Sequence, residues 1–164
     1  MDAAPGFVEL ATARSAALFR TALLLSGDWQ LAEDLVQETL GRLFVHWSKV
    51  ARADNPAAYA QATLVRTFLS GRRKRSSTER PTAELDTGQA PDDDVSLRVT
   101  LLAALARLDP PDRAVLVLRY WEDLDAPATA VLVGSTPAAV RTRCSRALGR
   151  LREVLGDDLA DLPH

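Results

Sequence analysis

Apolar residues recur at intervals of three and four along the first half of the chain, which is the spacing of an amphipathic helix. We predict one such helix over residues 6–25 and a second from Trp29 to Trp47. A Ser-Gly-Asp sequence separates them, since glycine favours the end of a helix and aspartate its start. After a loop predicted at 51–54, Asn55 followed by Pro56 is a strong start signal for a third helix.

The second half of the chain repeats the helical pattern after a polar stretch. Residues 76–95 contain breaker residues and three consecutive aspartates but few apolar side chains, so we predict a linker there. Further helices are predicted at 96–108, 112–122, 125–133 and from Pro137 to about residue 155. No strand pattern of any length occurs. We therefore expect an all-α protein with two small helical domains, 1–75 and 96–164, joined by a flexible acidic linker. Because each domain is small, we expect the two to pack against one another or an inhibitor when a larger partner is absent.

Two of the predicted helices form a helix-turn-helix. Gly134 ends the first of them, and Thr136 followed by Pro137 starts the second. Along that second helix Val140 and Cys144 belong to an apolar stripe. The polar residues between are expected to face outward and to contact DNA, and they are Arg141, Thr142, Arg143, Ser145 and Arg146. The N-terminal turns of such a helix enter the major groove, so Arg141 and Arg143 are the residues expected to touch base edges. A plain solvated basic helix is the alternative.

The second predicted helix carries a polar stripe opposite its apolar one. Its members lie at helical spacing and are Asp34, Gln37, Glu38 and Arg42. Such a stripe is either a solvated face or an acidic docking surface for a basic partner helix. The third predicted helix bears Arg66 and ends in Arg72, Arg73, Lys74 and Arg75. Cations near a helix C-terminus are favourable to its dipole, but four in a row exceed that need, and we expect contacts to a phosphate backbone.

Charge changes with position along the chain. The 164 residues carry a formal net charge of −2, which by itself argues against a nucleic-acid binder. Residues 1–75, however, sum to +3, the linker at 76–95 sums to −5, and residues 141–152 include five arginines and no acid. Two basic regions therefore flank an acidic spacer.

The side-chain inventory excludes most catalytic chemistry. One cysteine, Cys144, allows no internal disulfide and no cysteine-based zinc site, and it is expected to be a small buried side chain. His46 and His164 are too isolated to build a metal site. No nucleophile lies beside a histidine and no glycine-rich phosphate loop occurs, so no catalytic residue and no cofactor is expected. No apolar run reaches the roughly 20 residues of a membrane span, and the start lacks a basic signal-peptide region. We expect a cytoplasmic protein that is not an enzyme.

Several of these segments together resemble one known family. Residues 27–40, Trp47 and the Asn55–Tyr59 segment closely resemble the first domain of extracytoplasmic-function (ECF) sigma factors of the sigma-70 family, of the actinobacterial type. Residues 101–124 look like the start of that family's second domain, and the helix-turn-helix with residues 145–152 completes it. The resemblance covers nearly the whole chain, with two motif blocks in the family's order.

The resemblance implies a sigma factor that binds core RNA polymerase and directs promoter-specific transcription initiation. The stripe of Asp34, Gln37, Glu38 and Arg42 would contact the clamp helices of the largest subunit, and the polymerase flap would be a second contact. The −10 element would be read and opened by Lys49, Arg52, Asn55, Arg66, Arg72, Arg73, Lys74 and Arg75. The −35 element would be read by Thr136, Arg141, Thr142, Arg143, Ser145 and Arg146. An anti-sigma factor is a candidate partner, and a membrane is not.

Two other functions remain compatible with the sequence. A stand-alone helix-turn-helix regulator would bind DNA without polymerase, although the chain offers no spare helix for a dimer. A degenerate sigma factor would act only by protein interaction. Titration on promoter DNA with and without core polymerase separates the first from a sigma factor, and transcription with core enzyme separates the second.

Overall fold

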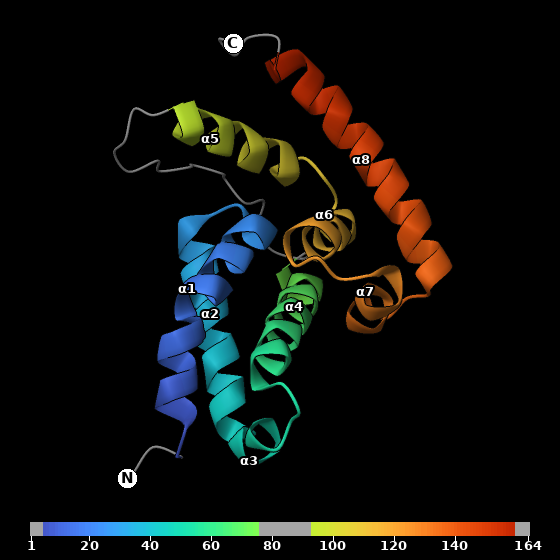
Figure 1. The fold of residues 1–164 in the computed structure, drawn as a ribbon. Helices are drawn as coiled ribbons and strands as arrows, with labels where there is room; N and C mark the ends of the chain where they lie inside the picture. Colours follow the sequence, from blue (N-terminus) through green and yellow to red (C-terminus); the bar gives the residue numbers. More distant parts are fainter. Residues whose placement is uncertain (1–4, 76–92, 160–164) are drawn as a thin grey trace.

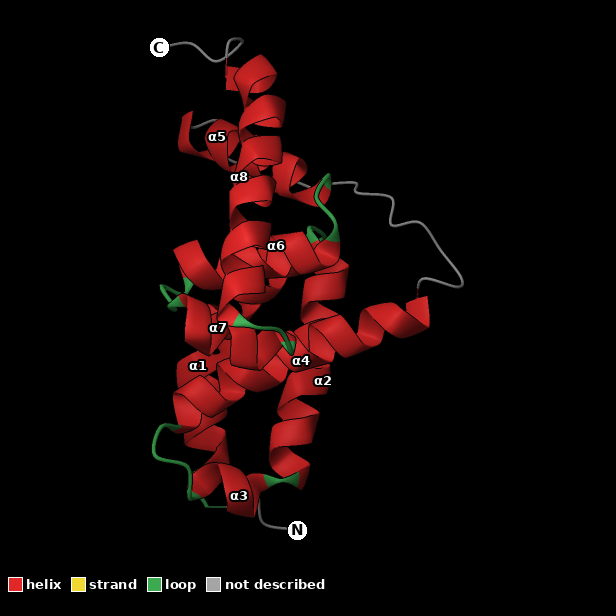
Figure 2. Ribbon diagram, turned by 90° about the vertical axis from the view of Figure 1, so that its right-hand side faces the viewer, coloured by secondary structure: helices red, strands yellow, loops and turns green. Residues whose placement is uncertain are grey.

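The structure, a computed structural model, describes residues 5–75 and 93–159, and helices make up nearly all of both stretches (Figure 2). No strand occurs in these two ranges, so the all-α fold class predicted from the sequence is confirmed. The first stretch contains α1 (Phe7–Ser26), α2 (Trp29–Val45), α3 (Trp47–Ala51) and α4 (Pro56–Arg75). The second contains α5 (Asp93–Ala106), α6 (Pro110–Leu116), the π-helix η1 (Val117–Trp121), α7 (Ala126–Val133) and α8 (Pro137–Leu159).

Short-range signals set the first helix ends, as predicted. Gly27 follows α1 with a φ of 73°, a left-handed conformation that favours glycine, and its N–H donates to a carbonyl of the last helical turn. The Asp28 carboxylate then caps α2 by accepting a hydrogen bond from the Leu31 N–H at 3.0 Å. The Asn55 side chain caps α4 in the same way, accepting from the Ala58 N–H at 3.1 Å.

The segment around residue 47 differs from the prediction. A helix reaching Trp47 was expected, but α2 stops at Val45 and the short helix α3 follows. The loop expected at 51–54 is present at 52–55, one residue later. The Trp47 indole Nε1 donates to the Pro5 carbonyl at 2.8 Å, and its ring meets Phe7 edge-on with centroids 5.6 Å apart. Because Pro5 lies 42 positions earlier in the chain, the periodicity of the segment itself could not reveal these contacts.

Three further boundaries also differ from those predicted. The helix expected at 112–122 begins at Pro110, since a proline is well accommodated in the first helical turn, and its final part is the π-helix η1. Helix α5 begins at Asp93, inside the stretch expected to be a linker, because acidic residues are favoured in the first turn of a helix. The other residues of that expected linker, 76–92, lie outside the described part of the chain. Helix α8 continues to Leu159 rather than ending near residue 155.

Each half has an aliphatic core. Helices α1, α2 and α4 form a bundle with α3 at one end, and α5, α6 and α7 pack along α8 (Figure 1). The fully buried side chains of the bundle include Leu18, Leu25, Leu43, Leu64 and Val65. The core along α8 includes Val115, Val140, Cys144 and Ala147.

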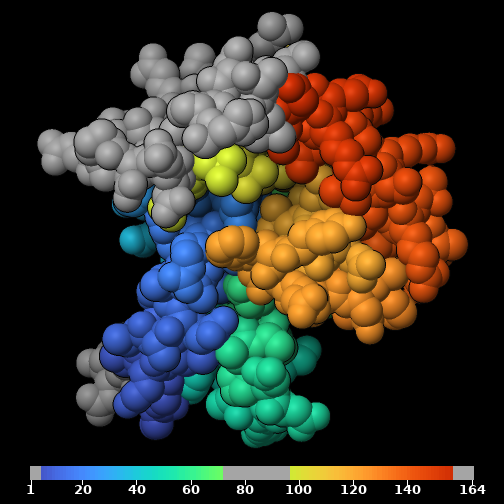
Figure 3. Space-filling model, turned by 45° about the horizontal axis from the view of Figure 1, so that its top comes forward, coloured from blue at the N-terminus to red at the C-terminus, as the bar shows by residue number. Residues whose placement is uncertain are grey.

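The two halves pack directly against one another, as expected for two small domains. Ala114, Val117 and Leu118 of the second half lie within the core of the first, and each is at most 3% exposed. Figure 3 shows the orange α6–α7 region directly against the blue α1 and the green α4. This apolar contact fixes how the helix-turn-helix sits relative to the bundle.

Two sets of hydrogen bonds also join the halves. The Arg113 guanidinium, which is 6% exposed, donates from Nη1 to the Leu25 carbonyl at 2.5 Å. The Glu122 carboxylate accepts at Oε1 from Thr21 Oγ1 at 2.5 Å and from Gln61 Nε2 at 2.8 Å. Because Thr21 belongs to α1 and Gln61 to α4, Glu122 fastens η1 to two helices of the bundle.

Candidate nucleic-acid and protein interfaces

The predicted helix-turn-helix is present as α7 and α8. Gly134 has a φ of 68°, and its N–H donates to the Ala130 carbonyl, so it ends α7 in the left-handed conformation that glycine tolerates. The Thr136 hydroxyl accepts from the Ala139 N–H at 3.1 Å and caps the start of α8. Proline at position 137 then begins the helix. These local signals fix where α7 ends and where α8 begins.

Helix α8 has one buried face and a polar remainder. Val140, Cys144 and Ala147 are buried against α6 and α7, as the apolar stripe predicted. The residues expected to face outward are all exposed: Arg141, Thr142, Arg143, Ser145 and Arg146. The structure therefore brings the predicted −35 residues together on one helix, beside the capping Thr136.

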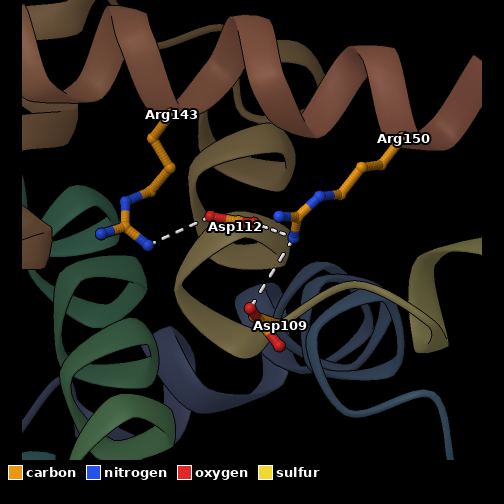
Figure 4. Close-up of polar contacts among 4 residues, drawn as sticks. All are labelled: Asp109, Asp112, Arg143 and Arg150. Carbon is orange, nitrogen blue, oxygen red and sulfur yellow. Dashed lines mark hydrogen bonds and ion pairs between the residues drawn. The ribbon is translucent and has the colours of Figure 1, made fainter.

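Two arginines of α8 turn toward α6 (Figure 4). Arg143 Nη1 lies 3.1 Å from Asp112 Oδ1, and Arg150 Nη1 lies 3.3 Å from Asp112 Oδ2. Arg150 Nη1 also lies 3.8 Å from Asp109 Oδ2. Sequence reasoning missed both acids, because nothing in a linear pattern pairs Asp112 with a residue 31 positions later.

A shallow hollow lies on the opposite flank of α8. It has a volume of about 370 Å³, and its lining includes Arg119 and Tyr120 from η1 and Arg141 and Arg152 from α8. Cys144 forms part of its base, and burial raises the pKa of this thiol above its ordinary value, although Arg119 lowers it in part. A raised pKa leaves the thiol protonated near neutral pH, so Cys144 serves packing rather than reactivity.

The polar stripe of α2 is exposed along its length. Asp34 accepts from Gln30 Nε2 at 3.1 Å, and Arg42 Nη2 pairs with Glu38 Oε1 at 3.0 Å within the same helix. Gln37 borders a second hollow of about 370 Å³, between α1 and α2. The α1 side of this hollow, Ser15 and Phe19, was not predicted from the sequence. A partner that contacts the stripe would meet α1 as well.

The predicted −10 residues lie in two places. Lys49, Arg52 and Asn55 are exposed around α3 at one end of the bundle. Arg66 is exposed on α4, about 15 Å further along at 1.5 Å per residue. The basic run at 72–75 ends α4, and its side chains lie outside the described part of the structure.

Among the described residues no cluster of three or more metal-ligating side chains occurs. No helix in the same part of the chain is long and apolar enough to cross a membrane.

Comparison with known proteins assigns both halves. Residues 10–78 match the family described as Sigma-70 region 2, and residues 98–151 match Sigma-70, region 4. The chain is 34% identical over 153 residues to RNA polymerase sigma-E factor of Streptomyces coelicolor, covering 91% of this chain and 85% of that protein. It is 30% identical over 148 residues to ECF RNA polymerase sigma factor SigL of Mycobacterium tuberculosis, covering 86% and 84%.

Solved structures show the same fold. The sigma factor RpoE in complex with the anti-sigma factor NepR from Bartonella quintana superposes with a TM-score of 0.71 at 23% identity, covering 93% of this chain and 98% of that one. CnrH in complex with the cytosolic domain of CnrY gives a TM-score of 0.63 at 23% identity, covering 93% and 88%. A region 2 bundle followed by a region 4 helix-turn-helix is the architecture of a sigma factor. The chain belongs to the ECF group of the sigma-70 family.

Proposed function

We propose that this protein binds core RNA polymerase and directs it to promoters, reading −10 DNA with residues 1–75 and −35 DNA with residues 96–164. The observation that carries the proposal is the order of the two matched regions, with region 2 on the bundle and region 4 on the helix-turn-helix. We also infer that it acts in the cytoplasm, where RNA polymerase works, and that it catalyses no reaction of its own.

The α2 stripe is the proposed docking surface for the clamp helices. Asp34, Gln37, Glu38 and Arg42 are exposed. Among the described residues, Asp34 bonds to Gln30 and Arg42 to Glu38, in each case four positions away on the same helix. Exposed i,i+4 contacts are weak, so a partner can replace them at little cost. The second proposed polymerase contact, the flap, would suit the exposed aromatic pair Tyr120 and Trp121, which are 61% and 54% exposed.

The proposed promoter contacts follow the two basic regions. Lys49, Arg52, Asn55 and Arg66 would meet the −10 element, together with the run at 72–75. On α8, Arg141, Thr142, Ser145 and Arg146 would meet the −35 element, beside Thr136. Arg143 shares their helix, but it forms an ion pair with Asp112 of α6.

An anti-sigma factor is a proposed partner as well. The RpoE chain that shares this fold is bound to one, and the exposed surfaces of α2 and α8 offer such a protein the same groups that polymerase and DNA would use. Mixing the protein with a candidate inhibitor before core enzyme is added would test this partner.

Transcription with purified components tests the proposal. Core enzyme plus this protein should start RNA synthesis at a promoter on which core enzyme alone is silent. Sequence-specific binding to duplex DNA without core enzyme would instead identify a stand-alone regulator. Stable binding to core enzyme with no initiation on any of a library of promoters would identify a degenerate sigma factor.

A further inference from the structure

The arginines of α8 fall into two electrostatic groups. Arg143 and Arg150 form ion pairs with acids of the α6 region. Arg141, Arg146 and Arg152 form no ion pair with any described residue. The sequence, which shows only a basic helix, does not separate these groups.

The geometry of the pairs explains the division. Arg143 and Arg150 are seven residues apart, which is about two helical turns, so they lie on the same side of α8. Asp112 stands between them on α6, and each of its carboxylate oxygens meets one guanidinium (Figure 4). Arg141 lies on the other flank of α8, where it lines the hollow with Arg119 and Arg152.

Asp112 has a strong need for these partners. Its carboxylate is 11% exposed, whereas the Arg143 and Arg150 side chains are 45% and 57% exposed. A nearly buried carboxylate is costly unless it is paired, and removing its partner leaves an uncompensated charge. Arg143 and Arg150 are therefore held by Asp112 more firmly than exposed ion pairs usually hold arginines.

This arrangement alters the charge that α8 presents to DNA. An arginine adds to sequence-independent affinity when it neutralises a phosphate and releases a counterion. The charges of Arg143 and Arg150 are already offset by two acids of the α6 region, Asp112 and Asp109, so these arginines have little to add. Among the side chains that the structure describes, the α8 cations without an ion pair are then Arg141, Arg146 and Arg152, and Arg146 lies one helical turn after the exposed Thr142.

We propose that Asp112 is a positioning residue that sets −35 specificity. It holds Arg143 and Arg150 on the α6 side of α8, which withdraws two cations from the phosphate backbone and fixes the rotation of the helix about its axis. The sequence-independent attraction between α8 and the DNA backbone is thereby kept low. The outward residues of α8 then account for a larger share of the free energy of binding to the −35 element. The inference rests on the proposed −35 role of α8, and it replaces base contact by Arg143 with a structural pairing.

The test measures two quantities with holoenzyme that contains full-length variants. One is the salt dependence of binding to an unrelated DNA duplex. The other is the preference among promoters whose −35 element is randomised. For Asp112→Asn we expect a salt slope steeper by about one, because Arg143 becomes free to meet a phosphate while Arg150 keeps its pairing with Asp109. We also expect a flatter −35 preference profile, since non-specific binding has risen.

Arg143→Gln is a second variant for the same two measurements. It is expected to fold as the wild type does, because Arg150 still pairs with the nearly buried carboxylate of Asp112. We expect its salt slope and −35 profile to equal those of the wild type. The matched control Arg141→Gln should lower the slope by about one. Adding Arg143→Gln and Arg150→Gln to Asp112→Asn should return the slope to the wild-type value, which a merely structural defect would not do.

Opposite results would overturn the inference. A slope lowered by about one in Arg143→Gln would mean that Arg143 contacts phosphate directly. An Asp112→Asn holoenzyme with wild-type slope and profile would mean that the ion pairs do not govern DNA binding. If the wild-type holoenzyme itself shows no −35 preference, the proposed −35 role fails first, and that result is distinct from a failure of Asp112 alone.

Discussion

At the scale of single residues, the exposed carboxylate of Asp34 is the sharpest test of polymerase docking. It lies on the solvent face of α2, and its hydrogen bond to Gln30 is a surface contact. We expect Asp34→Lys to leave the fold intact and to weaken binding to core enzyme by about 2 kcal/mol or more, roughly thirtyfold in Kd, since a reversed charge meets a complementary surface. Pull-down with purified core enzyme measures the loss.

Glu153→Lys, an equal charge change on exposed α8, is the control and should bind core normally. Retention of wild-type binding by folded Asp34→Lys would rule out this stripe as the docking surface.

Cys144 shows how burial sets the chemistry of one side chain. It is 6% exposed, and burial raises the pKa of its thiol above the ordinary 9.0, with Arg119 lowering it only in part. The unfolded chain therefore loses this proton at a lower pH than the folded one does. The buried, protonated thiol contributes its full stability at pH values below the pKa that it has in the unfolded chain. This contribution is lost as pH rises through the higher pKa that the thiol has in the folded protein. Between about pH 8 and about pH 10, we expect the free energy of unfolding to fall less in Cys144→Ala than in wild type. Equal losses in denaturant titrations of the two proteins would contradict this.

At the scale of elements, the start of α8 depends on one hydroxyl. Thr136 Oγ1 accepts from the Ala139 N–H at 3.1 Å, and losing such a cap typically costs about 1 kcal/mol. In a protein of this size Thr136→Ala should lower Tm by about 2–4 °C. Thr142→Ala is the matched control, because Thr142 is exposed within the same helix and alanine is a better helix former. Thermal unfolding followed by circular dichroism measures both. Equal Tm values for the two variants would show that the cap does not stabilise the helix.

At the scale of the whole molecule, Glu122 fastens the second half to the bundle. Its carboxylate accepts from Thr21 at 2.5 Å and from Gln61 at 2.8 Å. Glu122→Ala removes this acceptor, although Thr21 still donates to the Ala17 carbonyl and Gln61 to Thr21 Oγ1, so the expected cost is about 1 kcal/mol. We therefore expect the halves to separate more often, which X-ray scattering would detect as a larger radius of gyration.

The contact that Glu122 makes with the bundle also affects how fast the holoenzyme forms. Helix α4 carries proposed −10 residues, and it packs against α6 and α7 while the two halves are in contact. We therefore expect the halves to separate before α4 reads the promoter. Glu122→Ala should then form holoenzyme faster than wild type does in stopped-flow mixing with core enzyme. Glu153→Ala, which removes an exposed acid elsewhere, should change neither the radius nor the rate. A radius and a rate that are both unchanged in Glu122→Ala would show that the halves are held by apolar packing alone.

The sequence by itself determined the features that depend on near neighbours. Helix starts at Asp28, Asn55 and Thr136 could be predicted because a capping side chain bonds to a backbone N–H three residues later. The exposed faces of α2 and α8 could be predicted because helical periodicity relates positions three and four apart. The two motif blocks that carry the family resemblance also lay within the sequence, and the family matches confirmed them in the same order.

Only the tertiary structure decided which distant groups meet. Trp47, at the start of the short helix α3, bonds to Pro5. At the junction of the halves Thr21 meets Glu122, 101 positions away. The division of the α8 arginines depends on Asp112, 31 positions before Arg143. Each pair is brought together by burial of apolar surface elsewhere, which carries no local pattern. The sequence could therefore place Arg143 on an exposed helix, but only the packing of α6 against α8 could show that its charge is already neutralised.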